Sequence, residues 1–433
     1  MPNPNKEILR LAIPNIASNI SIPLLSAVDT YLMGQIPDPK YLGAIALGSA
    51  IFNFVFWSLG FLRMGTTGMT AQAFGQDDQK KIMALLVQGL VVAVLLAVAL
   101  LLFQKPFLSF SLWALGGSEG VHELAGTYFN IRIWAIPAAL IMLVMNGWFF
   151  GMQNTVIPLI VTILVNLCNI FFNLLFVRQM GMNADGVAMG TLIAQYIGLV
   201  ATVILFFYRY RHLIPKWEDI KERFDKSNFN QFFTVNRDIF IRTICLVFVF
   251  TFFSSISARS GDVVLSANQI LLLFLTMISY AIDGFAHAAE SLVGKYTGSK
   301  QTDSKWRSVR YSFYWGGGFA LLFLLFFVVF GRWMIGVFAE NEAVQAVAND
   351  YLPWLCLMPI VASAAYIWDG IYIGATAVKP MRNSMVVATF GIFLPLYYML
   401  APLYGNHALW LAFVLFMLAR SIFLGLLARK ALE

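Results

Sequence analysis

The residues best suited to chemistry begin with an acid inside an apolar stretch. Residues 9–34 read LRLAIPNIASNISIPLLSAVDTYLMG, which is long and apolar enough for a membrane-spanning helix. Its polar side chains recur at helical spacing and share one face: Asn15, Asn19, Ser26 and Asp29. Because an ionised Asp in lipid costs at least a few kcal/mol, this face should look into a bundle or a watery cavity. Asp29 is therefore the candidate coupling acid, and the alternative is an acid that only caps or pairs locally near the helix end.

The same stretch contains two prolines, Pro14 and Pro23, and each removes a backbone hydrogen bond from the helix. We expect the helix to bend, with Pro14 as the candidate hinge. Polar partners would attract the helix while Asp29 is ionised, and protonation would release it. An acid that titrates on a bending helix can act as a proton-driven switch.

Uncharged polar residues on two later apolar stretches are candidate partners for this acid. Asn169 and Asn173 are four residues apart, as are Thr191 and Gln195, so each pair shares a helical face. Hydrogen bonds from amides and hydroxyls can set the proton affinity of a carboxylate. The alternative function of these residues is helix–helix contact, and both functions can hold.

The second half of the chain carries more charge within its apolar stretches. Asp283, His287 and Glu290 share one helical stripe, while Asp369 and Arg242 lie on other stretches. Charged side chains are tolerated inside a membrane when they form ion pairs or face a water-filled cavity. We therefore expect Arg242 to pair with one of the acids. The group is a candidate coupling or substrate site, and the alternative is a structural ion-pair network. A metal site is disfavoured because the spacing of the stripe matches no zinc pattern.

The elements that must position these residues are membrane-spanning helices. The chain has 433 residues, of which 60% are hydrophobic and 12% charged, which is too little charge for the surface of a soluble protein. The predicted fold class is an all-α integral membrane protein with twelve spans, at about residues 7–34, 42–73, 81–104, 124–150, 155–178, 186–208, 238–258, 263–294, 308–332, 344–373, 381–402 and 407–428. Three cysteines in apolar runs form neither a disulfide framework nor a metal set.

Charge distribution predicts the orientation of these spans. The formal net charge is +7, and Lys and Arg fall mainly on alternate loops, on the same side as both termini. The positive-inside rule then places both termini in the cytoplasm. The basic charge is explained by this orientation and by anionic lipid headgroups, so we expect no nucleic-acid partner. We also expect no cleavable signal peptide, because the first span is too long and lacks a small-residue cleavage site.

The chain also repeats itself weakly. Gly75 and Gly298 end similar segments, and the same offset along the chain links Gly147 to Gly370 and Gly151 to Gly374. The repeat divides the chain into an amino-terminal lobe at 1–208, an inter-lobe loop at 209–236 and a carboxy-terminal lobe at 237–433. Six spans per lobe give both lobes the same orientation, an arrangement typical of transporters.

Several of these segments together resemble a known family. They read SAVDTYLMG, FLRMGTTGMTAQAFG, VNRDIFIRT, YAIDGFAHAAE, DGIYIGA with KPMRNSM, and LYGNHALWLA. They resemble the DinF-like branch of the multidrug and toxic compound extrusion (MATE) family, over nearly the whole chain. The resemblance implies two six-helix lobes, alternating access, and export of amphipathic, often cationic compounds in exchange for cations.

The resemblance also implies functions for individual residues. It implies that Asp29 is the proton-coupling acid and that Asn169, Asn173 and Thr191 are its polar partners. Asn173 is a departure, because many DinF-like relatives carry an Asp at that position. Because Asn173 cannot ionise, proton coupling would depend on Asp29 alone or on the acids of the carboxy-terminal lobe.

We therefore predict a proton-coupled multidrug exporter of the bacterial inner membrane. It would act as a monomer on small amphipathic or cationic molecules among membrane lipids, without a cofactor, using protons or alternatively Na⁺ as the coupling ion. The rival functions are a flippase for lipids or lipid-linked sugars and a scaffold or receptor without transport. A flippase would need a cationic cavity, and Arg63 and Arg242 could contribute to one. The intramembrane acids outnumber these arginines, which favours the exporter. We expect no enzyme, because no nucleophile–base pair or set of metal ligands is evident.

Overall fold

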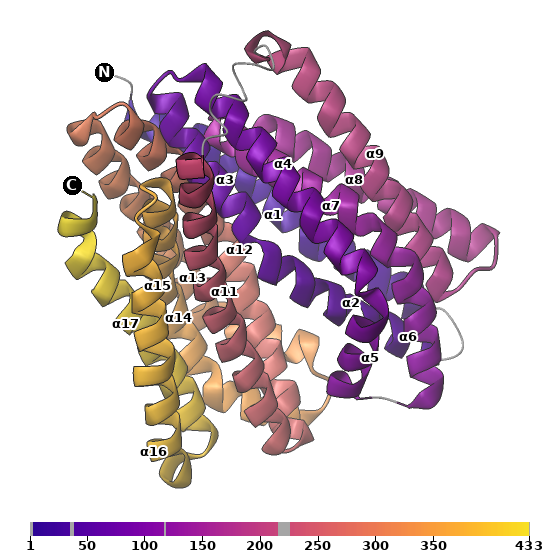
Figure 1. Cartoon of the computed structure of the whole chain (residues 1–433). Helices are drawn as coiled ribbons and strands as arrows, with labels where there is room; N and C mark the ends of the chain where they lie inside the picture. Colours follow the sequence, from indigo (N-terminus) through magenta and orange to yellow (C-terminus); the bar gives the residue numbers. More distant parts are fainter. Residues whose placement is uncertain (1–2, 35–38, 117, 215–225, 433) are drawn as a thin grey trace. The chain divides into compact units, whose positions relative to one another are not determined.

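The computed structural model of the chain describes residues 3–34, 39–116, 118–214 and 226–432, and these contain no strand (Figure 1). Side chains at 22–34, 39, 42 and 226–228 lie outside this description. Eleven helical segments of the described part, from Gly43–Gly75 to Asn406–Leu432, are long and apolar enough to cross a membrane. They coincide with the second to twelfth predicted spans, and α1 (Pro4–Gly34) covers the first.

The described helices fall into two groups along the chain. The first half continues with α2 (Pro39–Leu59), α3 (Phe61–Gly75), α4 (Gln79–Leu102), α5 (Gln104–Leu115), α6 (Glu119–Arg132), α7 (Ile136–Gly151), α8 (Val156–Leu174) and α9 (Ala184–Tyr210). The second half contains α11 (Lys226–Arg259), α12 (Asp262–Gly298), α13 (Thr302–Phe338), α14 (Glu342–Gly374), α15 (Val378–Val386), α16 (Leu394–Tyr404) and α17 (Asn406–Leu432). Because α11 begins at Lys226, the last part of the predicted inter-lobe loop is helical.

Contacts group the chain into two units, which we call the amino unit (Ala17–Phe232) and the carboxy unit (Met1–Ile16 with Phe233–Glu433). This grouping departs from the predicted lobes at the start of the chain, because the first part of α1 packs within the carboxy unit. Ile8, Leu11 and Ala12 are buried in one cluster with side chains of α12. Glu7 accepts hydrogen bonds from Lys295 Nζ at 3.2 Å and from the Tyr296 hydroxyl at 2.6 Å. The apolar stripe and this ion pair explain why the first residues complete the core of the carboxy unit.

Close helix contacts recur in the two units at equivalent positions. In the amino unit, a Cβ atom at Gly147 of α7 would overlap the backbone of Arg63 on α3. In the carboxy unit, a Cβ atom at Gly370 of α14 would overlap the backbone of Ala286 on α12. The offset between the two glycines equals the offset between the two residues that they approach. In both units, only glycine allows the helix pair to pack this closely.

Left-handed backbone conformations repeat in the same register. The described residues other than glycine with positive φ are Asp77 (56°) and Lys300 (57°), and Gln153 (60°) and Thr376 (53°). The two members of each pair are separated by the same offset as Gly147 and Gly370. Such conformations are uncommon outside glycine, so their recurrence at one offset confirms the predicted internal repeat.

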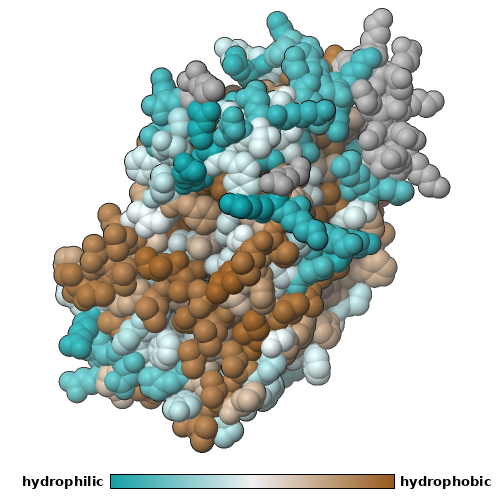
Figure 2. Space-filling model, turned by 90° about the vertical axis from the view of Figure 1, so that its left-hand side faces the viewer, coloured by the Kyte–Doolittle hydropathy of each residue, from teal (hydrophilic) through white to brown (hydrophobic). Residues whose placement is uncertain are grey.

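Large apolar side chains cover much of the molecular surface. On the face in Figure 2, hydrophobic residues gather over a broad area and hydrophilic residues lie toward its ends. Leu102, Trp113 and Leu426 are each at least 75% exposed. A water-soluble protein rarely exposes apolar areas this extensive, whereas lipid-facing helices require them. The chain is a multi-pass membrane protein.

Candidate functional site

The amino unit contains a ladder of uncharged hydrogen bonds between α8 and α9, which we call the amide ladder (Asn169, Asn173 and Thr191). Thr191 Oγ1 donates to the carbonyl of Val187 at 3.0 Å and accepts from Asn169 Nδ2 at 2.9 Å. Asn169 Oδ1 in turn accepts from Asn173 Nδ2 at 2.8 Å. The structure thus brings together the three residues predicted as partners of Asp29.

Close packing of α8 against α9 fixes the Asn173 end of this ladder. Asn173 is fully buried, and a Cβ atom at Gly190 would overlap its Oδ1 atom. The missing side chain at Gly190 therefore provides the space that the Asn173 amide occupies. An amide with two donors and one carbonyl oxygen suits this position, because it can extend a hydrogen-bonded chain without adding charge.

A second contact joins α8 to the later part of α1. Asn166 Nδ2 donates to Ser21 Oγ at 2.9 Å and approaches the Ser21 carbonyl oxygen at 3.4 Å. Asp29 lies two turns further along α1, a rise of about 12 Å. Its side chain is outside the described residues, so contact between Asp29 and the amide ladder stays a prediction. The proposed hinge also stays a prediction, since α1 is one helix through Pro14.

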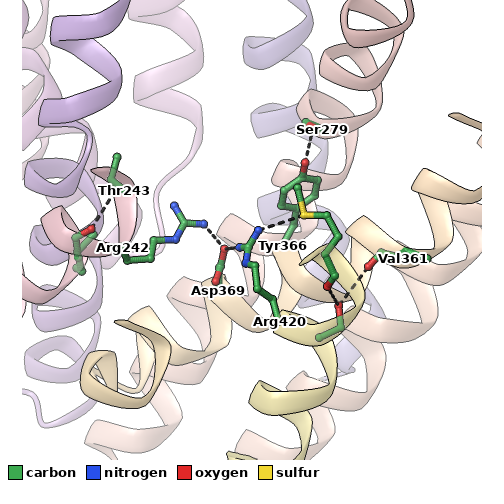
Figure 3. A network of polar contacts seen from close by, with 10 residues as sticks. Arg242, Thr243, Ser279, Val361, Tyr366, Asp369 and Arg420 are labelled. Carbon is green, nitrogen blue, oxygen red and sulfur yellow. Dashed lines mark hydrogen bonds and ion pairs between the residues drawn. The ribbon is translucent and has the colours of Figure 1, made fainter. Parts of the chain in front are cut away.

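The carboxy unit contains a charged cluster instead, which we call the arginine triad (Arg242 on α11, Asp369 on α14 and Arg420 on α17). Asp369 lies between the two guanidinium groups (Figure 3) and accepts from both at Oδ2, from Arg420 Nη2 at 2.5 Å and also from Arg242 Nη2. The side chains of Arg242, Asp369 and Arg420 are only 6%, 7% and 1% exposed. The predicted pairing of Arg242 with an acid is present, and the acid is Asp369.

The two arginines of the triad are held differently. Arg420 Nη1 contacts Met417 Sδ at 3.2 Å, and its guanidinium carbon lies 5.4 Å from the centre of the Phe416 ring. Within the part of the chain that the structure describes, Arg242 Nε and Asp369 Oδ1 have no hydrogen-bond partner. Arg420 is therefore held by three neighbours, Asp369, Met417 and Phe416, whereas Arg242 keeps an unused Nε donor.

The predicted stripe on α12 makes none of the described ion pairs of this triad. Glu290 is 1% exposed and Asp283 and His287 are half-buried, but the described ion pairs of Asp369 are with arginines. Asp283 lies within electrostatic range of Tyr366 on α14, whose hydroxyl accepts from Ser279 Oγ at 2.9 Å. Across the described residues, no three His, Cys, Asp or Glu side chains are placed to hold a metal ion.

A second aspartate shared by two arginines lies one turn from the triad on α11. Asp238 Oδ1 accepts from Arg382 Nη1 at 2.8 Å and from Arg237 Nη2 at 3.2 Å. Asp238 is 3% exposed, whereas Arg382 is 22% and Arg237 is 51% exposed. Since Asp238 precedes Arg242 by four residues, both lie on one face of α11.

Two arginines were missed in the sequence because each was hidden within a long predicted span. Arg420 interrupts the apolar run LFMLARSIFL, and Arg132 lies in the span at 124–150. Arg132 packs over the Phe52 ring at 4.7 Å and donates to Ser49 Oγ at 3.3 Å and to the Tyr128 hydroxyl. The sequence signal that could have identified them is a single arginine within an apolar span, because such an arginine needs a partner. With both counted beside Arg63 and Arg242, the acids no longer outnumber the internal arginines.

Comparison with known proteins gives consistent matches over the chain. The MatE family model matches twice, at residues 14–175 and 239–399, so each half of the chain carries one copy. DNA damage-inducible protein F of Escherichia coli is 36% identical over 98% of this chain and 92% of its own length. A probable multidrug resistance protein NorM of Rhizobium meliloti is 24% identical over 96% of this chain and 91% of its own.

The fold is matched by solved structures. The crystal structure of MATE in complex with MaL6 superposes with a TM-score of 0.89 at 17% sequence identity, covering 100% of this chain and 97% of that one. At this identity the likeness concerns the fold, and it agrees with the twelve-helix architecture predicted from the sequence.

Proposed function

Because the chain belongs to the MatE family of multidrug and toxic compound efflux transporters, we propose that it is a secondary active exporter that exchanges amphipathic, often cationic compounds for protons. The resemblance predicted from its motifs is confirmed. We further propose that the exporter works as a monomer by alternating access in the bacterial inner membrane, with both termini in the cytoplasm and no cofactor.

The observation that carries the coupling proposal is the contact between Asn166 and Ser21. It holds the helix that bears Asp29 against α8, the helix that also supplies Asn169 and Asn173 to the amide ladder. Polar side chains gathered inside spanning helices cost free energy unless they are paired or used. An acid on α1 would find hydrogen-bond donors on α8 and α9 within the same unit.

The proposed mechanism is a two-state switch of α1. Ionised Asp29 favours the shape in which α1 leans toward the amide ladder, because a carboxylate accepts hydrogen bonds from amides and hydroxyls. Protonated Asp29 accepts fewer bonds and favours the other shape, with Pro14 lowering the stiffness of the helix. A difference of about two pKa units between the two shapes would shift their populations about a hundredfold.

Transport in proteoliposomes tests this function. The full-length chain is reconstituted, a proton or a sodium gradient is imposed, and movement of ethidium is followed by fluorescence. We expect a proton gradient to drive transport, and Asp29→Asn to reduce it by about a hundredfold or more while the protein remains folded. Asp350→Asn is the matched control, because Asp350 is an exposed acid on α14.

The outcomes separate the alternatives. Transport driven by sodium alone would replace the proton by Na⁺ as the coupling ion. Full transport by Asp29→Asn would remove Asp29 from the mechanism. No movement of ethidium under either gradient would contradict export of cationic compounds.

One observation favours flippase activity on lipids or lipid-linked sugars as the second candidate. Arg132 and Arg420 raise the number of internal arginines, and arginine binds phosphate through a planar fork of donors. The same vesicles can carry a fluorescent lipid in one leaflet. Movement of that lipid without movement of ethidium would favour the flippase.

A further inference from the structure

We propose that the arginine triad is a subsite for an anionic group of the exported molecule, a carboxylate, sulfonate or phosphate attached to an amphipathic body. The inference deepens the exporter function proposed above and rests on it. It assigns the carboxy unit the opposite ligand preference from the acid Asp29 on α1. The substrates best suited to the chain would then be zwitterionic or anionic amphiphiles.

The first argument is the balance of charge. Two arginines share one aspartate at a place where all three side chains are at least nine-tenths buried. Among the described residues, Asp369, Arg242 and the Tyr366 phenol act electrostatically on Arg420. A buried cation without a full counter-charge costs several kcal/mol, so an arriving anion would be stabilised here more than in water.

The second argument is the unequal support of the two arginines. Arg420 donates to Asp369 Oδ2 at 2.5 Å and also contacts Met417 and Phe416. Arg242 contributes the other bond to the same oxygen and has an unused Nε donor. A guanidinium presents Nε and Nη donors in a fork that matches a carboxylate or phosphate. Arg242 can therefore donate its Nε and Nη hydrogens to a ligand while Arg420 remains paired with Asp369.

The third argument is the positive charge that continues along α11 toward an exposed end. One turn before Arg242, Arg237 and Arg382 share Asp238, and these two arginines are 51% and 22% exposed. The two shared aspartates thus serve four arginines. Asp283 on α12 opposes this excess in part, because it acts electrostatically on Tyr366. The Tyr366 hydroxyl accepts from Ser279 Oγ at one side of the triad (Figure 3).

A pair of dyes that differ only at the anionic group tests the proposal. Rhodamine 19 carries a free carboxylate, and rhodamine 6G is its ethyl ester. Binding of each dye to the purified full-length chain is measured by fluorescence polarisation without any ion gradient. We expect the acid to bind about tenfold more tightly than the ester, as one charge-assisted, bidentate contact allows.

Variants of opposite charge then change this acid-to-ester ratio in opposite directions. Arg242→Gln leaves one arginine for one aspartate and should reduce the ratio to about one, because the fork is lost. Asp369→Asn leaves two arginines without an acid and should raise the ratio above that of the unmodified chain. Arg259→Gln, which removes an exposed arginine from the end of the same helix, should leave it unchanged. The ratio does not depend on the fraction of folded protein, and if Asp369→Asn fails to fold, Arg242→Gln decides.

Three results would overturn the subsite. They are equal binding of both dyes to the unmodified chain, an unchanged ratio in Arg242→Gln, and a lowered ratio in folded Asp369→Asn. Competition by inorganic phosphate together with equal dye binding would indicate a site for small anions only, which also overturns it. Failure of the exporter function has a different signature, because binding of the acid with no gradient-driven movement of either dye refutes export and leaves the subsite standing.

Discussion

The amino and carboxy units share a backbone plan but differ in the polar groups that they bury. Gly147 and Gly370 make equivalent helix contacts, and the positive-φ residues recur at one offset. At the level of side chains, the amino unit joins two helices through neutral amides and a hydroxyl, whereas the carboxy unit joins three helices through charges. The two repeats therefore share close helix contacts and backbone conformations but differ in their buried polar side chains.

This difference determines what each cluster tolerates. A neutral hydrogen bond contributes about 1 kcal/mol net, and a buried partner left unsatisfied costs about 1–3 kcal/mol. A charge left without its partner inside the protein costs about 3–5 kcal/mol. Single substitutions should therefore destabilise the carboxy unit more than the amino unit.

The largest effect is expected from Asp369→Ala. It leaves the buried guanidinium groups of Arg242 and Arg420 without their shared acid, so we expect the free energy of unfolding to fall by about 3–5 kcal/mol. Thermal unfolding in detergent can be followed with a thiol-reactive dye, because Cys168, Cys245 and Cys356 are free. A loss below about 1 kcal/mol would be within the range of exposed ion pairs and would contradict buried pairing.

An apolar triple variant provides the matched control for that prediction. Replacing Arg242, Asp369 and Arg420 by Met, Leu and Met removes the charges together, and such replacements are often neutral or stabilising. Most of the lost stability should return. If the triple variant is as unstable as Asp369→Ala, the loss comes from packing and the contrast between the two units is weaker than proposed.

Asn169→Ala should have an intermediate effect. It removes the central member of the amide ladder and leaves Asn173 Nδ2 and Thr191 Oγ1 without their shared partner, at a cost of about 1–3 kcal/mol. The same thermal assay applies. Gln195→Ala is the control, since Gln195 lies one turn from Thr191 on α9 and outside the ladder. Equal losses in both variants would show that the ladder adds nothing specific.

Thr191→Val should have the smallest effect. Valine keeps the shape of the side chain but removes the oxygen that accepts from Asn169, so a loss of about 1 kcal/mol is expected. Thr191→Ser keeps the hydroxyl and should recover most of this loss. A serine variant that unfolds as early as the valine variant would point to the lost methyl group instead.

Much of the fold was predictable because it depends on local patterns. Apolar runs located the spans, and helical spacing correctly placed Asn169 and Asn173 on one face. The common offset between paired glycines revealed the repeat, because glycine is required wherever two helices meet at their backbones. Each of these signals is contained within one helix or recurs at a fixed distance along the chain.

The choice of partners was not predictable to the same degree, because periodicity shows which residues share a face and not which helix lies opposite. Arg242 was expected to pair with an acid, but its sharing of Asp369 with Arg420 depends on α11, α14 and α17 meeting in space. The docking of the first residues on α12 was hidden for the same reason. Asp29, the residue with the strongest sequence argument, stays a prediction.

The docking of α1 has a consequence for how the protein is made. Glu7 pairs with Lys295, 288 residues later, and the Trp315 side chain donates to Asn5 at 3.0 Å across 310 residues. At a synthesis rate of about 5–20 residues per second, Lys295 is added roughly 15–60 s after Glu7. The carboxy unit, although made last, cannot close its core without the first residues made. A chain cut between residues 214 and 226 should therefore reassemble only when the amino-terminal fragment contributes the first part of α1 to the carboxy unit.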